Sequence, residues 1–442
     1  MSDVSTLNPA VPVHRAGHRS RNPHHPDPRT DGRSRRGGQS PWNGTTDPAT
    51  FRQLMDELGA LPTRQQPLWP DPDVLHSVHR ELLERAPLVR PAEVDLLSSH
   101  LSRVAAGRVH VLQAGDCAED PEQSSPTHVI RKAGLLDTLA GALRMSTGKP
   151  VVRVGRIAGQ YVKPRSQTSE NVQGTELPVF RGHMVNSPLP GLLHRLPDPR
   201  RILLCHDAAA GVMQALRSQL PHGAGVDSPV WTSHEALLLD YEVPALRRLD
   251  DGRLLLTSTH WPWIGERTRH PDGAHVELLS RVANPVACKV GPQMSAAELL
   301  TLCERLDPRR RPGRLTLIAR IGADLAGSRL PDLVKVVREE GYPVIWMCDP
   351  MHGNTISSPR GRKTRLITSL IEEVRQFRRA VEENGGAAGG LHLEATPDAV
   401  TECVADAAHL AAVDAPDAAY LTACDPRLSM SQALSVISAW EN

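Results

Sequence analysis

VIWMCDPMHGNT, at residues 344–355, is the stretch that decides the fold. Its short apolar run, Val344–Met347, is followed directly by a thiol, a carboxylate and an imidazole on Cys348, Asp349 and His352. A short apolar run bounded by turn residues is typical of a strand in a parallel sheet. In barrels of such strands, functional side chains follow the strand ends. The stretch therefore predicts a core strand that leads into a functional loop.

The same pattern recurs on both sides of this stretch, from Val109 onward. The other predicted strands are His110–Gln113, Val151–Val154, a weak one at Trp231–His234, Leu255–His260, Val286–Val290, Leu315–Ala319 and Leu391–Glu394. Amphipathic helices are predicted at Ala296–Arg305, Pro331–Glu340 and Leu366–Glu383. Eight strand and helix units predict an α/β fold, a closed (β/α)8 TIM barrel over residues 109–442. An open doubly wound sheet is the alternative, but its GxGxxG turn is absent.

Two segments precede the predicted barrel. Residues 1–45 are rich in Pro, His, Arg, Ser and Gly with almost no apolar periodicity, so we predict a disordered tail. Residues 46–108 carry Phe51, Leu54 and Leu58 at helical spacing and a second helical patch over 74–83. They predict an N-terminal helical extension of the barrel.

Composition narrows the class of protein. Lys plus Arg number 51 and Asp plus Glu number 50, so no global field favours a nucleic-acid or membrane partner. Neither an apolar run of membrane-spanning length nor an apolar leader is visible, and we expect a soluble, cytoplasmic protein. Seven scattered cysteines without a CxxC spacing suit a reducing compartment.

Four potential metal ligands follow predicted strands or lie in a late loop: Cys117, His352, Glu394 and Asp425. One thiolate, one imidazole and two carboxylates suit Mn²⁺, Co²⁺, Fe²⁺ or Zn²⁺. Taken singly, each side chain also has a structural interpretation, as a buried thiol, a hydrogen-bonding ring or a helix cap. A Cys–His hydrolase site is the other alternative, but no nucleophile elbow is present.

Basic residues form a second set at the same predicted rim. They are Arg156, Lys163, Arg165, Arg181, Arg267, Lys289, Arg320 and Lys363. Charges in a partly buried barrel mouth need anions, so the set indicates a substrate with more than one phosphate or carboxylate. Internal ion pairs with Glu119, Glu235 or Glu266 are the alternative, and Lys363 is open to a surface position.

Nine blocks in order resemble class II 3-deoxy-D-arabino-heptulosonate 7-phosphate (DAHP) synthases over nearly all of residues 50–435. The blocks are LQAGDCAED, VGRIAGQYVKPRS, SHEALLLDYE, WIGERTR with DGAH, NPVACKVGP, RPGRLTLIARIG, VIWMCDPMHGNT, GGLHLEAT and TACDPRLSMSQ. The resemblance implies a (β/α)8 barrel, a homo-oligomer and a divalent metal, Mn²⁺ or Co²⁺ before Zn²⁺ or Fe²⁺. It places the metal ligands on Cys117, His352, Glu394 and Asp425.

The resemblance also implies the reaction, in which phosphoenolpyruvate and erythrose 4-phosphate condense to DAHP and phosphate at the start of the shikimate pathway. It assigns phosphoenolpyruvate to Arg156, Lys289 and Arg320, erythrose 4-phosphate to Lys163, Arg165 and Ser166, and Glu266 and Arg267 to the space between the substrates. Lys163, Glu266 and a metal-bound water are candidates for the acid and base, and the sequence leaves their roles open.

The chain departs from the family at two places. His183 stands where the family usually has Asp, and the stretch Leu203–Trp231 is short, with one predicted helix at Ala208–Leu220. The short stretch predicts weak or absent inhibition by Trp, Phe or Tyr and a role in secondary metabolism. Two alternatives stay open: an aminoDAHP synthase, favoured only by His183, and a non-catalytic barrel that binds a partner.

Cys424 precedes the predicted ligand Asp425. A disulfide between Cys424 and Cys117 that ejects the metal is one interpretation of this position, and a quiet buried thiol is the other.

Overall fold

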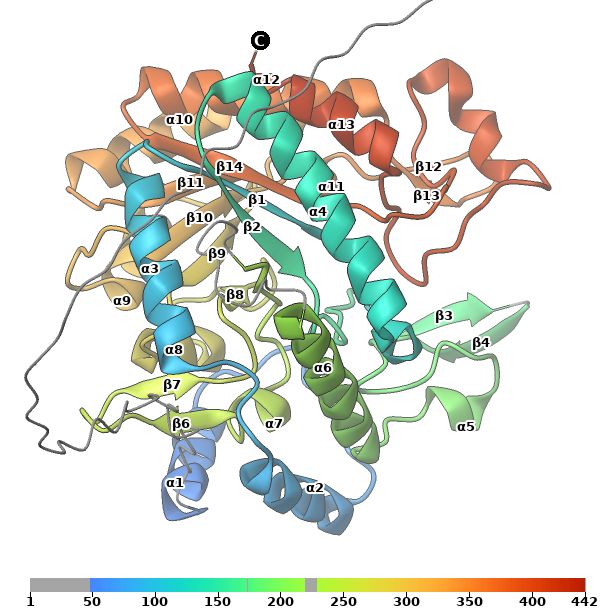
Figure 1. The fold of residues 1–442 in the computed structure, drawn as a ribbon. Coiled ribbons are helices and arrows are strands. Elements are labelled where there is room, and N and C mark those ends of the chain that lie inside the picture. The colour runs from blue at the N-terminus through green and yellow to red at the C-terminus, as the bar shows by residue number, and fades with distance from the viewer. Residues whose placement is uncertain (1–47, 173, 219–228, 442) are drawn as a thin grey trace, which may run out of the picture. The chain divides into compact units, whose positions relative to one another are not determined.

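The computed structural model describes residues 48–172, 174–218 and 229–441, and its centre is a ring of parallel strands (Figure 1). In pairing order these are β5 (Trp231–Thr232), β2 (Val151–Arg156), β1 (His110–Gly115), β14 (Ala387–Glu394), β11 (Ile345–Cys348), β10 (Leu315–Ala319), β9 (Val286–Val290) and β8 (Trp263–Ile264). The two ends of the series meet, because Glu235 forms a parallel bridge with Trp263. The eight strands described here therefore form a (β/α)8 barrel, as the sequence predicts.

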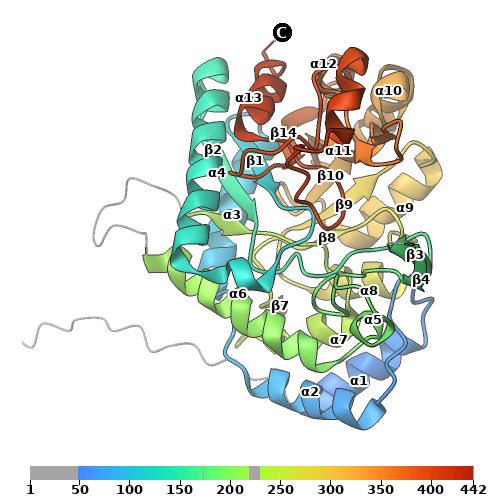
Figure 2. The same ribbon diagram turned by 90° about the vertical axis from the view of Figure 1, so that its right-hand side faces the viewer.

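A layer of helices follows the strands around the ring (Figures 1 and 2). Its members are α4 (Pro126–Thr147), α6 (Arg200–Ser218), α8 (Ala274–Arg281), α9 (Ala296–Leu306), α10 (Ala323–Glu339), α12 (Ile367–Glu383) and α13 (Met430–Ser438). α8 packs on α9, α9 on α10, α10 on α12, α12 on α13, and α13 on α4. Strands β9 and β10 are buried along their whole length, which explains why their sequences, VACKV and LTLIA, are largely apolar rather than alternating.

Three helices precede the barrel, α1 (Pro48–Gly59), α2 (Pro72–Glu84) and α3 (Pro91–Ala105), so the predicted helical extension is present and α3 adds to its two predicted helical patches. α3 packs against β11 and β14. Its buried Leu97, Leu101 and Val104 join a core cluster with Val111 and Ile345, which lie at or near the starts of their strands. The helix thereby covers the N-terminal end of the barrel. The predicted disordered tail, residues 1–45, lies outside the described residues.

Short elements occupy the connections. They are η1 (Pro121–Ser124), the hairpin of β3 (Ser169–Val172) and β4 (Thr175–Pro178), α5 (Leu192–Arg195), α7 (Leu239–Glu242), the hairpin of β6 (Leu246–Arg248) and β7 (Leu254–Leu256), α11 (Pro350–Gly353), the pair β12 (Ile356–Ser357) and β13 (Lys363–Thr364), and η2 (Ala407–Asp414). Among the described helices, none has both the length and the apolar character that crossing a membrane requires.

The predicted fourth barrel strand, Leu255–His260, is wrong. The apolar residues there form β7, which pairs antiparallel with β6 in a separate sheet. The barrel strand at this place is β8, which spans only two residues between Pro262 and Gly265. Because Pro and Gly are turn signals, a sequence pattern does not recognise so short a strand.

Two predicted helix starts are also wrong, although α9 and α12 match their predictions to within one residue at each end. α10 begins at Ala323, and Pro331, predicted as its start, lies in its interior. α6 begins at Arg200 rather than Ala208, and the predicted end at Leu220 lies outside the described residues. α10 has no capping side chain of its own at Gly322, so a local pattern could not locate its start.

Gly390 lies opposite Val111, where β14 pairs with β1, and a substitution there tests how closely the two strands pack. Its φ is +150°, and a Cβ there would overlap the carbonyl oxygen of Val111. We expect Gly390→Ala to lower the free energy of unfolding by about 3 kcal/mol, measured by urea denaturation. Gly211→Ala in α6, where a Cβ meets open space, is the control and should stabilise by up to about 1 kcal/mol. Equal midpoints for Gly390→Ala and the parent protein would contradict this account.

Candidate active site

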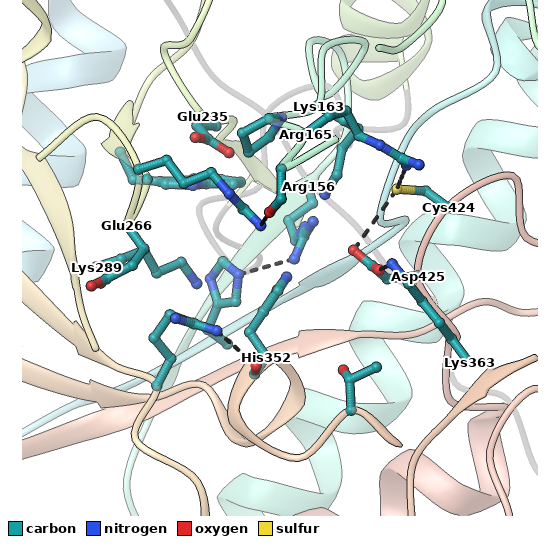
Figure 3. Close-up of a pocket in the computed structure, with 18 of the residues that line it drawn as sticks. Arg156, Lys163, Arg165, Glu235, Glu266, Lys289, His352, Lys363, Cys424 and Asp425 are labelled. Atoms are coloured by element: carbon teal, nitrogen blue, oxygen red, sulfur yellow. Dashed lines mark hydrogen bonds and ion pairs between the residues drawn. The ribbon is translucent and has the colours of Figure 1, made fainter. Parts of the chain in front are cut away.

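A cavity of about 370 Å³ opens at the C-terminal ends of the barrel strands (Figure 3). Most site residues proposed from the sequence line it: Arg156, Lys163, Arg165, Ser166, Glu266, Arg267, Lys289, Arg320, His352, Lys363 and Asp425. Cys117 and Glu394 are fully buried directly beside it. The cavity also has walls from Glu235, Trp263 and His392, which the sequence interpretation did not assign to substrate.

The four predicted metal ligands meet around Asp425. The Sγ of Cys117 lies 3.4 Å from Oδ2 of Asp425, and Nε2 of His352 lies 3.2 Å from Oε1 of Glu394. The ligand atoms of His352, Glu394 and Asp425 all lie within 4.8 Å of one another. Asp425 is thus shared by a thiol on one side and by an imidazole and a second carboxylate on the other, and this donor set fits the chemistry of a divalent transition metal.

Cys424 is a further donor that the sequence interpretation treated only as a redox partner. Its Sγ belongs to a second group, with Cys117 and Asp425, whose ligand atoms lie within 4.8 Å of one another. Nη1 of Arg165 donates to this sulfur over 3.4 Å. All seven cysteines are free thiols in the structure. The sulfur atoms of Cys117 and Cys424 lie close together, and a disulfide between them stays a prediction.

The ring of His352 is oriented by Asp349. Nδ1 of His352 lies 2.8 Å and 3.0 Å from the two carboxylate oxygens, and Nζ of Lys289 donates to the same group over 2.5 Å. Burial raises the pKa of Asp349, but the charges of His352 and Lys289 outweigh it and hold that pKa well below its ordinary value. Because Nδ1 donates to this carboxylate, Nε2 is the ring nitrogen that faces the other predicted metal ligands.

Glu394 is kept ionised by two arginines. Nη2 of Arg156 donates to Oε1 over 3.1 Å, and Nη2 of Arg365 donates to Oε2 over 2.9 Å. Burial raises the pKa of Glu394, but His352 and the two guanidinium groups hold it well below its ordinary value. Arg365, which the sequence analysis missed, thus secures a buried anionic ligand.

Four predicted cations have internal carboxylate partners, but not the suggested ones. Lys363 pairs with the predicted metal ligand Asp425 over 2.8 Å. Arg156 pairs with Glu394 and Lys289 with Asp349, while Nη2 of Arg165 donates to Glu170 over 2.9 Å. The suggested partner Glu119 instead accepts the backbone N–H groups of residues 158–160, over 2.7 to 3.0 Å. Glu119 thereby holds the loop that leads to Lys163.

Three other cavity cations lack a carboxylate within 4.0 Å among the described residues: Lys163, Arg267 and Arg320. Arg267 donates to the hydroxyl of Ser166 over 2.7 Å, and Arg320 donates to the carbonyl of His352 over 2.7 Å. Hydroxyl and carbonyl groups do not neutralise a guanidinium. These side chains are therefore ready to bind anionic groups of a substrate.

The cavity holds groups with shifted protonation. Burial lowers the pKa of Lys289 to about 8, an effect that Asp349 only partly offsets. Burial would also lower the pKa of Lys163, but the thiols and carboxylates around it raise that pKa above its ordinary value. Burial raises the pKa of Glu235, whose Oε1 has no hydrogen-bond partner among the described residues. In the sequence, Glu235 directly follows the predicted strand Trp231–His234, and this position was the signal that could have identified it as a site residue.

The N-terminal extension reaches the site through Gln65. Its side-chain oxygen accepts the backbone N–H of Arg165 over 2.8 Å, and its φ of +64° directs the chain into this contact. Nη1 of Arg181 donates to the carbonyl of Gln65 over 3.5 Å. Arg181, predicted at the rim, does not line the cavity and instead fastens this segment.

His183 does not line the cavity either. Its ring packs edge-on against Phe180 with centroids 5.2 Å apart, and its carbonyl accepts Nε of Arg201 over 2.6 Å. The position at which the resemblance predicts a departure from the family therefore lies outside the cavity lining.

Comparisons with known proteins give one family. The model of the Class-II DAHP synthetase family matches residues 54–226 and 224–439. The chain is 54% identical over 379 residues to a "Probable phospho-2-dehydro-3-deoxyheptonate aldolase" of Pseudomonas fluorescens, covering 85% of this chain and 94% of the relative. It is 39% identical to the phospho-2-dehydro-3-deoxyheptonate aldolase of Streptomyces coelicolor (89% and 97% covered) and 36% identical to AroG of Mycolicibacterium smegmatis (87% and 93%). The chain therefore belongs to the Class-II DAHP synthetase family of enzymes.

Proposed function

We propose that the cavity condenses phosphoenolpyruvate with erythrose 4-phosphate to give DAHP and phosphate. The observation that carries this proposal is the meeting of Lys163, Arg267 and Arg320, none with a carboxylate partner among the described residues, beside the cluster of metal donors. Two phosphorylated substrates supply the anions that these cations lack. The similar proteins of Pseudomonas fluorescens, Streptomyces coelicolor and Mycolicibacterium smegmatis, named as phospho-2-dehydro-3-deoxyheptonate aldolases, support the same reaction.

Cys117, His352, Glu394 and Asp425 would hold a divalent metal, with Mn²⁺ or Co²⁺ preferred and Zn²⁺ or Fe²⁺ as alternatives. The fit rests on the chemistry of the donor set and on the proximity of the ligand atoms. When bound, the ion supplies Lewis-acid polarisation of the aldehyde oxygen of erythrose 4-phosphate. Cys424 stands close enough to be a further donor.

The two walls of the cavity would divide the substrates. Arg156, Lys289 and Arg320 would take phosphoenolpyruvate, and Lys163, Arg165 and Ser166 would take erythrose 4-phosphate. Glu266 and Arg267 would lie between them. The hydrogen bond from Arg267 to Ser166 supports the place of Arg267 between the substrates, because it links Arg267 to a residue on the erythrose 4-phosphate side. Fixed cations hold both reactants in one geometry and so make the bimolecular step effectively unimolecular.

In the proposed reaction, C3 of phosphoenolpyruvate forms a bond to the aldehyde carbon, and the aldehyde oxygen takes up a proton. Water adds at C2, and phosphate leaves. Lys163 is protonated near neutral pH and can donate the first proton. Glu266 remains a candidate base, and Glu235 joins it because its free Oε1 and raised pKa suit a proton acceptor.

The geometry disfavours both alternatives. The aminoDAHP synthase interpretation rested on His183, which packs on Phe180 and Arg201 outside the cavity lining. A non-catalytic barrel has no need of a buried Glu394 held ionised beside three other donors. Condensation of phosphoenolpyruvate with erythrose 4-phosphate is therefore preferred.

We expect metal-reconstituted protein to consume phosphoenolpyruvate and release phosphate only when erythrose 4-phosphate is present. Chelator should abolish turnover, and Mn²⁺ or Co²⁺ should restore it. Asp425→Asn should raise the metal concentration for half-activation by at least about 10-fold, because it weakens a ligand. Asp417→Asn, at an exposed position in the same region, is the control. Chelator-insensitive turnover, or none with any divalent metal, would contradict the proposal.

Lys289 gives a pH test. Its pKa of about 8 means that it is charged below pH 8 and neutral above, so attraction for phosphoenolpyruvate is lost as the pH rises through this value. We expect kcat/KM for phosphoenolpyruvate to decline above about pH 8. The Lys289→Arg variant stays charged over this pH range, so its kcat/KM should lack this decline, even though that kcat/KM is lower than the wild-type value. A wild-type profile that is flat to about pH 10 would refute the role of Lys289.

We further propose a homo-oligomeric, cytoplasmic enzyme of secondary metabolism with weak aromatic feedback. The support for weak feedback is the short sequence between Leu203 and Trp231. The resemblance implies that family members with feedback carry an extra helical pair in the stretch Leu203–Trp231, of which α6 is the described helix here. We expect less than about 2-fold inhibition by saturating Trp, Phe or Tyr in a steady-state assay, too small to reflect a coupled site. Strong inhibition by any of them would contradict the proposal.

A further inference from the structure

Two loops of the cavity wall lie directly against each other. The first follows β10 and carries Arg320, and the second is α11, which carries His352. A Cβ on Gly353 would overlap the backbone nitrogen and Cα of Gly322, so the two backbones are in contact. Arg320 also donates to the carbonyl of His352 over 2.7 Å. A shift of either loop would therefore move both side chains.

This contact is held from behind by Glu373 on α12. Glu373 is 1% exposed, and its Oε1 accepts the backbone N–H groups of Ile321 over 3.0 Å and Gly322 over 2.8 Å. Its Oε2 accepts Nδ2 of Asn354 over 2.6 Å. The carboxylate therefore joins the first loop to the residue that follows α11.

Asn354 completes the connection in the opposite direction. Its Oδ1 accepts the backbone N–H of Ala323 over 3.0 Å, and its Nδ2 also donates to the carbonyl of Pro350 over 2.8 Å. Three successive N–H groups at the start of α10 thus find acceptors on Glu373 and Asn354. The first N–H groups of a helix need such acceptors, and Gly322 supplies none from its own side chain.

The donors and acceptors leave little freedom in this arrangement. Both carboxylate oxygens of Glu373 accept, and one of them must face the amide nitrogen of Asn354. Burial, reinforced by the charge of Asp349, raises the pKa of Glu373 to about 7, so the site carries a costly buried acid. A glutamine would fill the same volume but present an N–H group to the amide of Asn354.

We propose that Glu373 and Asn354 are a positioning pair that sets Arg320 relative to His352. The inference rests on the proposed function, in which Arg320 binds phosphoenolpyruvate and His352 binds the metal. Neither Glu373 nor Asn354 lines the cavity, so both act through the residues that they hold. The pair fixes the distance between the phosphoenolpyruvate cation and the metal centre.

The first test variant is Glu373→Gln. Its side-chain amide places an N–H group against the N–H group of Asn354, and the lost hydrogen bond should loosen both loops. We expect about 10-fold increases in the KM for phosphoenolpyruvate and in the metal concentration for half-activation. The KM for erythrose 4-phosphate should change little, because Lys163, Arg165 and Ser166 stand on other loops. Steady-state kinetics with each substrate and metal titration give these values, and thermal melting reports any general loss of folding.

A rescue separates positioning from a general packing role. In the double variant Glu373→Gln with Asn354→Asp, the new amide can donate to the new carboxylate, whose other oxygen can still accept the N–H of Ala323, while the hydrogen bond to the carbonyl of Pro350 is lost. We expect this variant to recover part of the loss in phosphoenolpyruvate KM and metal activation. Glu372→Gln, exposed on the same helix, is the matched control and should behave as wild type.

Arg320→Ala distinguishes failure of this inference from failure of the proposed function. If Arg320→Ala raises the KM for phosphoenolpyruvate while Glu373→Gln leaves both KM and metal activation unchanged, positioning is overturned and the proposed function stands. A fall in melting temperature alone, or a double variant no better than Glu373→Gln, also overturns it. If Arg320→Ala leaves that KM unchanged, the substrate assignment is wrong and the inference falls with it.

Discussion

Charge compensation of Glu394 is the interaction on which the rest of the site depends. An ionised carboxylate without solvent costs several kcal/mol unless its oxygens are paired. Arg156 comes from β2, Arg365 from the segment before α12, and His352 from α11, and all three contact this one side chain. β2, α11 and the segment before α12 are thus joined to β14 by the same group that serves as a proposed metal ligand. The packing of these elements and the charge of the proposed metal site therefore depend on the same carboxylate.

Much of the barrel could be predicted because parallel strands are covered on both faces. β9 and β10 consist entirely of buried residues, and their predicted bounds agree with the structure. β8 could not be found in this way, since hydrogen bonds to its neighbours define its two residues and composition does not. The start of α10 was missed for a related reason: its acceptors, Glu373 and Asn354, are distant in sequence.

The site was predictable in membership but not in pairing. The strand-end rule and the family resemblance named most residues that line the cavity. They could not show that Lys289 pairs with Asp349, or that Glu119 accepts backbone N–H groups rather than binding a cation. These partners come from different strands and loops, so barrel geometry decides them. The unpaired oxygen of Glu235 is likewise visible only once its neighbours are placed.

The extension before the barrel has become inseparable from it. α3 seals the end of the ring away from the cavity, while Gln65, from the same extension, supports the backbone of Arg165 at the cavity itself. Because the extension contacts both ends of the barrel, the barrel and its leading helices form one mechanical unit, which runs from the closed end of the ring to the rim of the cavity.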